Sequence, residues 1–145
     1  MHAGATIKEL ERAGADPGRV LVVEVSPRFP TTQGLGEHRH RLHVDQIDVL
    51  IESDREPFVI GDPEPSDDER AIAAFVDDYV VDGATIQTGI GGVPSTVASL
   101  LAAGDKGDFG VHSEMFTTGL MKLHLAGKVT NHKGVYDGVS ITTFA

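Results

Sequence analysis

Cysteine and tryptophan are absent from this sequence of 145 residues, and aromatic residues make up only 6% of it. Without cysteine the chain has no disulfide, no thiolate ligand for a metal and no cysteine nucleophile. Basic residues are also few, since 12 lysines and arginines stand against 22 aspartates and glutamates, for a net charge of −10. This balance disfavours nucleic acid as a partner, because phosphate binding needs a basic stripe.

Long apolar runs are missing as well. No segment approaches the roughly 20 apolar residues that cross a bilayer, and the N-terminus lacks the basic and apolar pattern of a signal peptide. We therefore expect a cytoplasmic protein with no membrane partner. The hydrophobic content of 40% is sufficient for a chain of this length to bury a sizeable core.

The acidic charge is concentrated in one stretch of the chain. Residues 57–82 carry eight acidic groups and one basic group, whereas residues 83–145 carry four of each. The start of the acidic stretch also holds three of the seven prolines, which is typical of a linker between domains. The sequence therefore predicts two domain-forming parts, residues 1–56 and 66–145, joined by a linker at residues 57–65.

The first part is predicted to hold a helix over residues 6–14 and strands within residues 20–25 and 44–52. Thr6 and Glu9 match the capping box that marks the start of a helix. The first strand is apolar along almost its whole length, which indicates a buried strand.

The second part opens with another capping box, at Ser66 and Glu69, followed by a helix. Apolar residues recur in this helix at helical spacing and are predicted to face a core; they are Ile72, Phe75, Val76 and Tyr79. Further along, residues 118–126 predict a helix, and the alternation in residues 139–144 predicts a strand.

A glycine-rich turn between a strand and a helix is the central feature of the sequence. Residues 84–88 have the alternation of a short strand, and residues 95–103 predict a helix whose first turn holds Pro94. Residues 109–113 are the next apolar run, and Glu114 ends it. The turn between the first strand and the helix consists of Gly89, Ile90, Gly91, Gly92 and Val93.

A strand, a crossover helix and a second strand form a βαβ unit, whose strands are parallel. Parallel strands have their carboxyl ends at one edge, so the turn and Glu114 should lie side by side where open α/β sheets bind ligands. From the residues alone, the glycines either bring backbone N–H groups to a ligand oxygen or only permit a tight turn. Likewise, Glu114 is either a functional carboxylate or a solvated end of a strand.

Two motifs in this region resemble a known family. TIQTGIGGVP at residues 85–94 and GVHSEMFTTG at residues 110–119 are similar to the acetyl-CoA hydrolase/transferase family, which includes acetate, succinate, butyrate and 4-hydroxybutyrate CoA-transferases. The upstream segments VVEVSPRFP, HVDQIDVLIES and PEPSDDERAIAAFV also resemble this family. Its members are several times longer, so the resemblance covers a middle slice of them.

The resemblance implies an α/β fold with a CoA-transferase-like open sheet, parallel βαβ units and parts of two domains. Residues 1–56 would be the closing part of the N-terminal CoA-transferase domain, and residues 66–145 the opening part of the C-terminal acetyl-CoA hydrolase/transferase domain.

The resemblance also implies a reaction, in which CoA moves from an acyl-CoA to a small carboxylate. Glu114 would be the nucleophile that forms a mixed anhydride and then a glutamyl-CoA thioester. The turn from Gly89 to Val93 would bind CoA or substrate. No metal and no permanently bound cofactor is implied, since the CoA thioester is a substrate.

Other functions stay open at this point. If water replaced the acceptor carboxylate, the same residues would make an acyl-CoA hydrolase. The chain is alternatively an inactive fragment or a structural subunit, because a final strand without a partner favours association with a second copy or a complementing chain. A generic nucleotide-binding domain is a further alternative, although Val93 and Pro94 stand where a dinucleotide fingerprint needs its third glycine.

The histidines are given no role. His38, His40 and His43 alternate with arginines and have no thiolate beside them, so we interpret them as part of a solvated loop rather than a metal site. His112 and His124 flank the candidate site and are interpreted as structural or surface residues.

Overall fold

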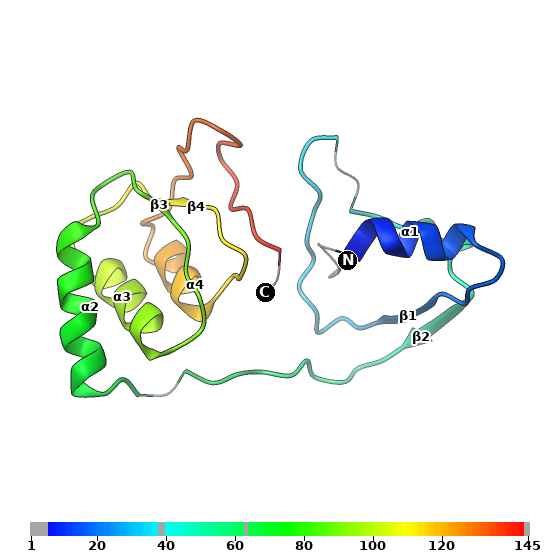
Figure 1. Cartoon of the computed structure of the whole chain (residues 1–145), viewed down its shortest axis with the longest axis horizontal. Helices are drawn as coiled ribbons and strands as arrows, with labels where there is room; N and C mark the ends of the chain where they lie inside the picture. The colour runs from blue at the N-terminus through cyan, green and yellow to red at the C-terminus, as the bar shows by residue number, and fades with distance from the viewer. Residues whose placement is uncertain (1–5, 38–39, 63, 144–145) are drawn as a thin grey trace. The chain divides into compact units, whose positions relative to one another are not determined.

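The computed structural model describes residues 6–37, 40–62 and 64–143, and the chain divides into two compact units, Met1–Val59 and Ile60–Ala145 (Figure 1). Each unit contains a two-stranded sheet with parallel strands. The protein is therefore of the α/β class, as predicted. None of the described helices is long and apolar enough to span a membrane. The assignment of the two parts to two CoA-transferase domains stays a prediction.

In its described residues, the first unit contains one helix, two strands and one 3₁₀ turn. These are α1 (Ile7–Ala15), β1 (Val22–Val25), η2 (Val44–Gln46) and β2 (Val49–Glu52). The two strands pair in parallel, with Val22 opposite Val49 and Val25 opposite Glu52. The predicted helix and both predicted strands are thereby confirmed.

Two predicted details of the first unit are wrong. Thr6 is the N-cap of α1 but makes no capping hydrogen bond with its side chain, and Glu9 pairs instead with Arg12. β1 is not buried, since Val22 is 52% exposed and Val25 is 41% exposed. The physical reason is that two short strands make up the described sheet of this unit and leave its edges and much of its faces to solvent.

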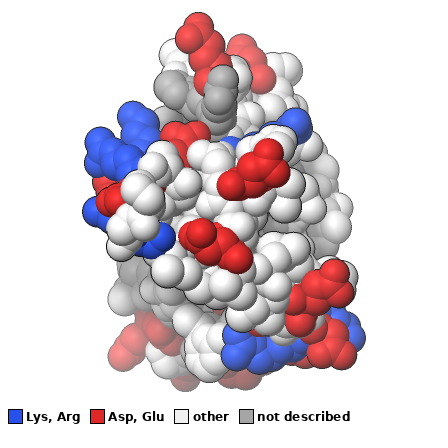
Figure 2. All heavy atoms as spheres, turned by 90° about the vertical axis from the view of Figure 1, so that its right-hand side faces the viewer, with Lys and Arg blue, Asp and Glu red and all other residues white. Residues whose placement is uncertain are grey.

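On the face shown in Figure 2, basic side chains at the left edge and the lower right lie beside acidic ones, while other acidic side chains stand apart. In the first unit, Arg19 pairs with Asp16 at 3.3 Å. Arg55 pairs with Glu24 at 2.9 Å. The positive charge of these guanidinium groups is therefore offset locally.

The second unit contains three helices and two short strands in the described residues. They are α2 (Asp67–Tyr79), β3 (Thr85–Ile86), α3 (Gly92–Ala103), β4 (Gly110–Val111) and α4 (Thr118–Leu125). β3 and β4 are parallel, with Thr85 opposite Gly110, so the predicted βαβ unit is confirmed. α3 lies between α2 and α4 and packs against both of them (Figure 1).

Most of the buried apolar side chains belong to the second unit, where α3 and α4 pack beneath the strands. Six of them form one cluster: Ala98, Leu101, Phe109, Val111, Leu120 and Leu123. α3 and α4 approach closely at Gly119, where a Cβ atom would lie only 2.6 Å from the Cβ of Ala98. Among the described residues, the first unit buries a single large apolar side chain, Leu21.

Helix α2 begins at the predicted capping box. The Glu69 N–H donates to Ser66 Oγ at 3.3 Å, and the Ser66 N–H donates to Glu69 Oε2 at 2.8 Å. The prediction that its apolar stripe faces a core is wrong, because Ile72, Phe75, Val76 and Tyr79 are 48%, 70%, 37% and 86% exposed. α2 packs against α3 through the face that carries the buried Ala73, and no other described element covers the stripe.

Acid should weaken the start of α2 through Glu69. The hydrogen bonds from Ser66, the backbone N–H first, hold the pKa of Glu69 below its usual value of 4.5. The stabilisation is therefore present above the unfolded pKa and is lost as the pH falls through the lower, folded pKa. We expect the free energy of unfolding, measured with urea between about pH 6 and pH 3, to fall less in Glu69→Gln than in the original chain. An equal fall in both would contradict this.

The segment after α4 contributes isolated pairings to the sheet rather than the full strand predicted over residues 139–144. Ile141 bridges His112, and Val129 bridges Phe109; residue 144 lies outside the described residues. Asn131 completes the edge of β4, because its Oδ1 accepts the Val111 N–H at 2.8 Å. Its backbone has φ of 59°, a conformation that asparagine tolerates better than most residues. The Asn131 side chain thus replaces the backbone carbonyl that would otherwise accept the Val111 N–H.

Candidate active site

β3 and β4 end side by side; the glycine turn begins three residues after β3, and Glu114 lies three residues after β4. The last backbone bond between the two segments runs from the His112 N–H to the Ile86 carbonyl, at 3.1 Å. Thr88 and Ser113 then join the segments again, because Ser113 Oγ donates to the Thr88 carbonyl at 3.1 Å and accepts the Thr88 N–H at 3.3 Å. The glycine turn therefore continues from Thr88, and Glu114 follows Ser113, the two residues that these hydrogen bonds join.

The Glu114 side chain is exposed, while the preceding Ser113 is buried. Successive side chains of an extended segment point to opposite sides, which accounts for this alternation. The backbone at Glu114 is held by the Thr143 N–H, which donates to the Glu114 carbonyl at 2.9 Å. Within the described residues, the Glu114 carboxylate forms no hydrogen bond and no ion pair. Its oxygens are therefore available to a ligand.

The glycine turn presents backbone N–H groups. Gly91 has φ of 138° and ψ of 170° and is the N-cap of α3; this conformation is essentially restricted to glycine. The N–H groups of Gly89, Ile90 and Gly91 donate no hydrogen bond to other described residues. Since they stand at the positive end of a helix dipole, they suit an oxygen that carries negative charge.

Two members of the predicted turn belong to the helix instead. Gly92 and Val93 begin α3 two residues before Pro94, the residue that the sequence placed in the first turn. The Ser95 N–H donates to the Gly91 carbonyl at 3.2 Å, and proline is tolerated anywhere in the first turn because N–H groups there have no partner within the helix. The role of all five residues in binding stays a prediction.

Gly92 faces the carboxylate of Glu69, and a Cβ atom at this position would overlap that carboxylate. Glu69 cannot easily retreat, because it closes the capping box with Ser66. The helices α2 and α3 therefore meet with their N-terminal turns in contact. Nothing in the sequence pattern indicated this requirement for glycine.

Gly92→Ala should destabilise the chain by about 1 kcal/mol, because the new methyl group displaces Glu69 from its cap. In a Glu69→Ala background the same substitution should instead be stabilising, by about 0.5 kcal/mol, since alanine is the better helix former. Urea unfolding of the four combinations measures both effects. If Gly92→Ala changed the free energy of unfolding in the same direction in both backgrounds, the overlap with Glu69 would not be the cause of the destabilisation.

A third hydroxyl group extends the cluster at this edge. Thr117 is the N-cap of α4, and its Oγ1 lies 3.0 Å from Thr88 Oγ1 and 3.4 Å from the Leu120 nitrogen, which donates to it. The ends of both strands and the start of α4 are thus connected through Thr88, Ser113 and Thr117. Sequence reasoning missed these three residues. The available signal was a hydroxyl residue directly before the glycine turn and another directly before Glu114.

Three of the histidines singled out in the sequence have side-chain partners in the described residues, while the side chain of His112 is exposed. His43 caps η2, where its ring accepts the Asp45 N–H at 3.3 Å, and His40 Nε2 lies 2.8 Å from Thr32 Oγ1. Burial lowers the pKa of His124, whose Nε2 lies 2.8 Å from Ser140 Oγ. His38 lies outside the described residues, and the part of the chain that is described contains no cluster of metal-binding side chains.

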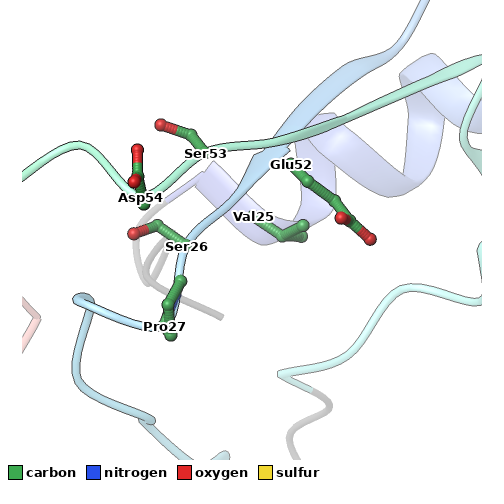
Figure 3. Close-up of a pocket in the computed structure, with 6 residues that line it drawn as sticks. All are labelled: Val25, Ser26, Pro27, Glu52, Ser53 and Asp54. Atoms are coloured by element: carbon green, nitrogen blue, oxygen red, sulfur yellow. The ribbon is translucent and has the colours of Figure 1, made fainter.

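The first unit also has a pocket, at the carboxyl ends of β1 and β2, with a volume of about 550 Å³. Ser53 and Asp54 project to one side of the strand ends and Glu52 to the other (Figure 3). Two arginines follow these strands, but Arg28 pairs with Glu56 at 2.8 Å and Arg55 pairs with Glu24. The residues lining the pocket are Val25, Ser26, Pro27, Glu52, Ser53 and Asp54. The carboxylates of Glu52 and Asp54 would repel the phosphates of CoA.

Comparisons with known proteins agree with the resemblance to CoA-transferases that the two sequence motifs indicated. The chain is 39% identical over 123 residues to a probable butyrate:acetyl-CoA coenzyme A-transferase of Syntrophomonas wolfei, which covers 84% of this chain and 27% of that protein. It is 33% identical over 134 residues to the 4-hydroxybutyrate coenzyme A transferase of Clostridium kluyveri, covering 92% of this chain and 30% of the relative. No protein-family model matches the chain.

Solved structures show the same similarity. RipA from Yersinia pestis superimposes with a TM-score of 0.80 at 31% identity, over 88% of this chain and 28% of RipA. A 4-hydroxybutyrate CoA-transferase from Porphyromonas gingivalis superimposes with a TM-score of 0.68 at 31% identity, over 86% of this chain and 30% of that structure. The chain thus spans less than a third of the length of each of these proteins.

Proposed function

Because this chain belongs to the family of butyrate, 4-hydroxybutyrate and acetate CoA-transferases, we propose that it moves CoA between an acyl-CoA and a small carboxylate through a glutamyl-CoA thioester on Glu114. The observation that carries the proposal is an exposed carboxylate without a partner in the described residues, attached beside a turn whose N–H groups are also unpaired. The acyl group and the acceptor would be bound partly by residues beyond this segment of the family.

The proposed reaction consists of two displacements. A Glu114 oxygen attacks the thioester carbonyl carbon, the carbon–sulfur bond breaks, and CoA leaves as a thiolate with the electron pair. The thiolate then attacks the glutamyl carbonyl carbon of the mixed anhydride, which releases the first carboxylate and leaves CoA bound to Glu114. An acceptor carboxylate reverses both displacements and leaves as the new acyl-CoA. No oxidant, metal or permanently bound cofactor takes part.

The turn would stabilise these displacements electrostatically. Each one places negative charge on a former carbonyl oxygen, and N–H groups that are already oriented lower the free energy of such an oxyanion. Gly89, Ile90 and Gly91 supply candidate donors at the edge to which Glu114 is attached. We expect the reaction to take place in the cytoplasm.

Trapping with borohydride tests the proposal. The chain is incubated with acetyl-CoA, treated with borohydride and digested, and the mass of the peptide containing Glu114 is measured by mass spectrometry. Reduction of a glutamyl thioester to the alcohol leaves the side chain with one oxygen fewer and two hydrogens more than the acid, and this change should require acetyl-CoA. Exchange of labelled acetate into acetyl-CoA without any modified Glu114 peptide would contradict the proposal.

The same geometry also accommodates hydrolysis, since water could intercept the anhydride or the thioester. The exchange assay separates the two reactions, because a hydrolase releases free CoA without moving label from acetate into new acetyl-CoA. A structural role is favoured by a different observation, the exposed apolar stripe of α2, in which Phe75 is 70% and Tyr79 is 86% exposed. Such a stripe suits a second copy or a complementing chain, and size-exclusion chromatography measures that association.

A further inference from the structure

Ser113 connects the two halves of the proposed site, and we propose that it is the positioning residue that keeps the amide turn in register with the Glu114 carboxylate. This inference rests on the proposed function of Glu114. Ser113 itself is 3% exposed and faces away from the solvent-exposed side of its strand, so it does not touch substrate.

The hydroxyl group of Ser113 takes over where the backbone pairing of β3 and β4 ends. It accepts the Thr88 N–H at 3.3 Å and donates to the Thr88 carbonyl at 3.1 Å. A hydroxyl has one donor and two acceptor sites, so one oxygen satisfies both backbone groups. Thr88 is only 8% exposed, and water cannot readily replace this partner.

The backbone of Ser113 is fixed independently of its side chain. The Ser113 N–H donates to the Ile141 carbonyl at 2.9 Å, on the opposite side from Thr88. Ser113 therefore links its own segment to two neighbouring segments. Its N–H binds the segment of Ile141, and its hydroxyl group binds the segment of Thr88. Because Gly89 follows Thr88 and Glu114 follows Ser113, the two hydrogen bonds set the distance between the turn and the carboxylate.

Ser113→Ala should slow formation of the glutamyl-CoA thioester about 10- to 100-fold, since a displacement near 1 Å is sufficient for such a loss. The affinity for CoA, measured by calorimetry, should change by less than about threefold, because the turn shifts relative to Glu114 without changing the orientation of its own N–H groups relative to α3. Ser113→Thr retains the hydroxyl group and should recover the rate to within about threefold. A purely structural role would instead lower rate and affinity together, with no recovery by threonine.

Ser140→Ala is the matched control. It also removes a serine hydroxyl with protein partners, His124 and Asn131, from the neighbouring segment, yet it leaves the bonds to Thr88 intact. Its thioester should form at the original rate. Ser113→Ala at the original rate, with Glu114→Gln inactive, would overturn this inference and leave the proposed function standing. Normal exchange by Glu114→Gln would instead overturn the proposed function.

Amide hydrogen exchange supplies a readout that does not depend on catalysis. In Ser113→Ala the Thr88 N–H loses its acceptor, so its exchange should accelerate about tenfold or more. Ser140→Ala should leave exchange at Thr88 unchanged. Equal rates at Thr88 in the two variants would show that the Ser113 hydroxyl does not hold the turn.

Discussion

Glu114→Gln is expected to lower the rate of CoA exchange by at least about a thousandfold, the scale of loss seen when a covalent nucleophile is removed. Glutamine has the shape of glutamate, but its amide cannot attack a thioester to give an activated anhydride. The original carboxylate is exposed and forms no bond with described residues, so the free energy of unfolding should stay within about 0.5 kcal/mol of the original. Exchange of labelled acetate into acetyl-CoA measures the rate, and urea unfolding measures the stability.

Glu114→Asp tests whether the position of the carboxylate matters as well as its chemistry. Its carboxylate is chemically competent but is withdrawn by one methylene group, and such a displacement should reduce the rate about a hundredfold. The trapped adduct should then form slowly on the shortened carboxylate rather than disappear. If both variants exchanged CoA as fast as the original chain, the nucleophile would lie elsewhere.

Gly119→Val is expected to destabilise the chain by about 3 kcal/mol, the upper part of the range for overpacked cores. Even the first carbon of the new side chain would lie 2.6 Å from the Ala98 Cβ, and Ala98 is completely buried in α3. Side-chain rotation moves neither Cβ atom, so α3 and α4 must move apart and loosen the packing of Leu101 in α3 and Leu123 in α4. Urea unfolding followed by circular dichroism measures the change.

Two further variants separate this collision from other effects of replacing glycine. Gly61→Val is the control, because no atom lies within 4 Å of a Cβ at that position, and its effect should stay within about 0.5 kcal/mol. Gly119→Ala combined with Ala98→Gly moves the methyl group from one helix to the other, and should be more stable than Gly119→Ala alone. A double variant no more stable than the single one would contradict the proposed contact.

The βαβ unit and the order of its elements could be predicted because they depend on local patterns. Alternation, helical spacing and a glycine turn are each visible within about ten residues, and the parallel pairing of β3 with β4 follows from the connection between them. The capping box at Ser66 is local in the same way. Thr6 shows the limit, since its sequence matches the motif but Glu9 has a competing partner in Arg12.

Burial could be predicted less well, because periodicity shows which face of a helix is apolar but not what covers it. The stripe of α2 containing Phe75 is the example, since the described chain packs the neighbouring face, at Ala73, against α3. The hydroxyl cluster of Thr88, Ser113 and Thr117 was missed for a related reason. The partners Ser113 and Thr88 are separated by 25 residues, and only the assembled sheet edge brings them within hydrogen-bonding distance.

The unequal division of the core has a consequence for how the chain would respond to a protease. The six side chains of the buried cluster all belong to the second unit, whereas Leu21 is the one large apolar side chain that the described part of the first unit buries. Cleavage in the connecting stretch near Val59 would therefore release two pieces of very different durability. The piece from Ile60 onward keeps its packed interior and should resist further digestion, while a two-stranded ribbon with one short helix is marginal in water and should be degraded.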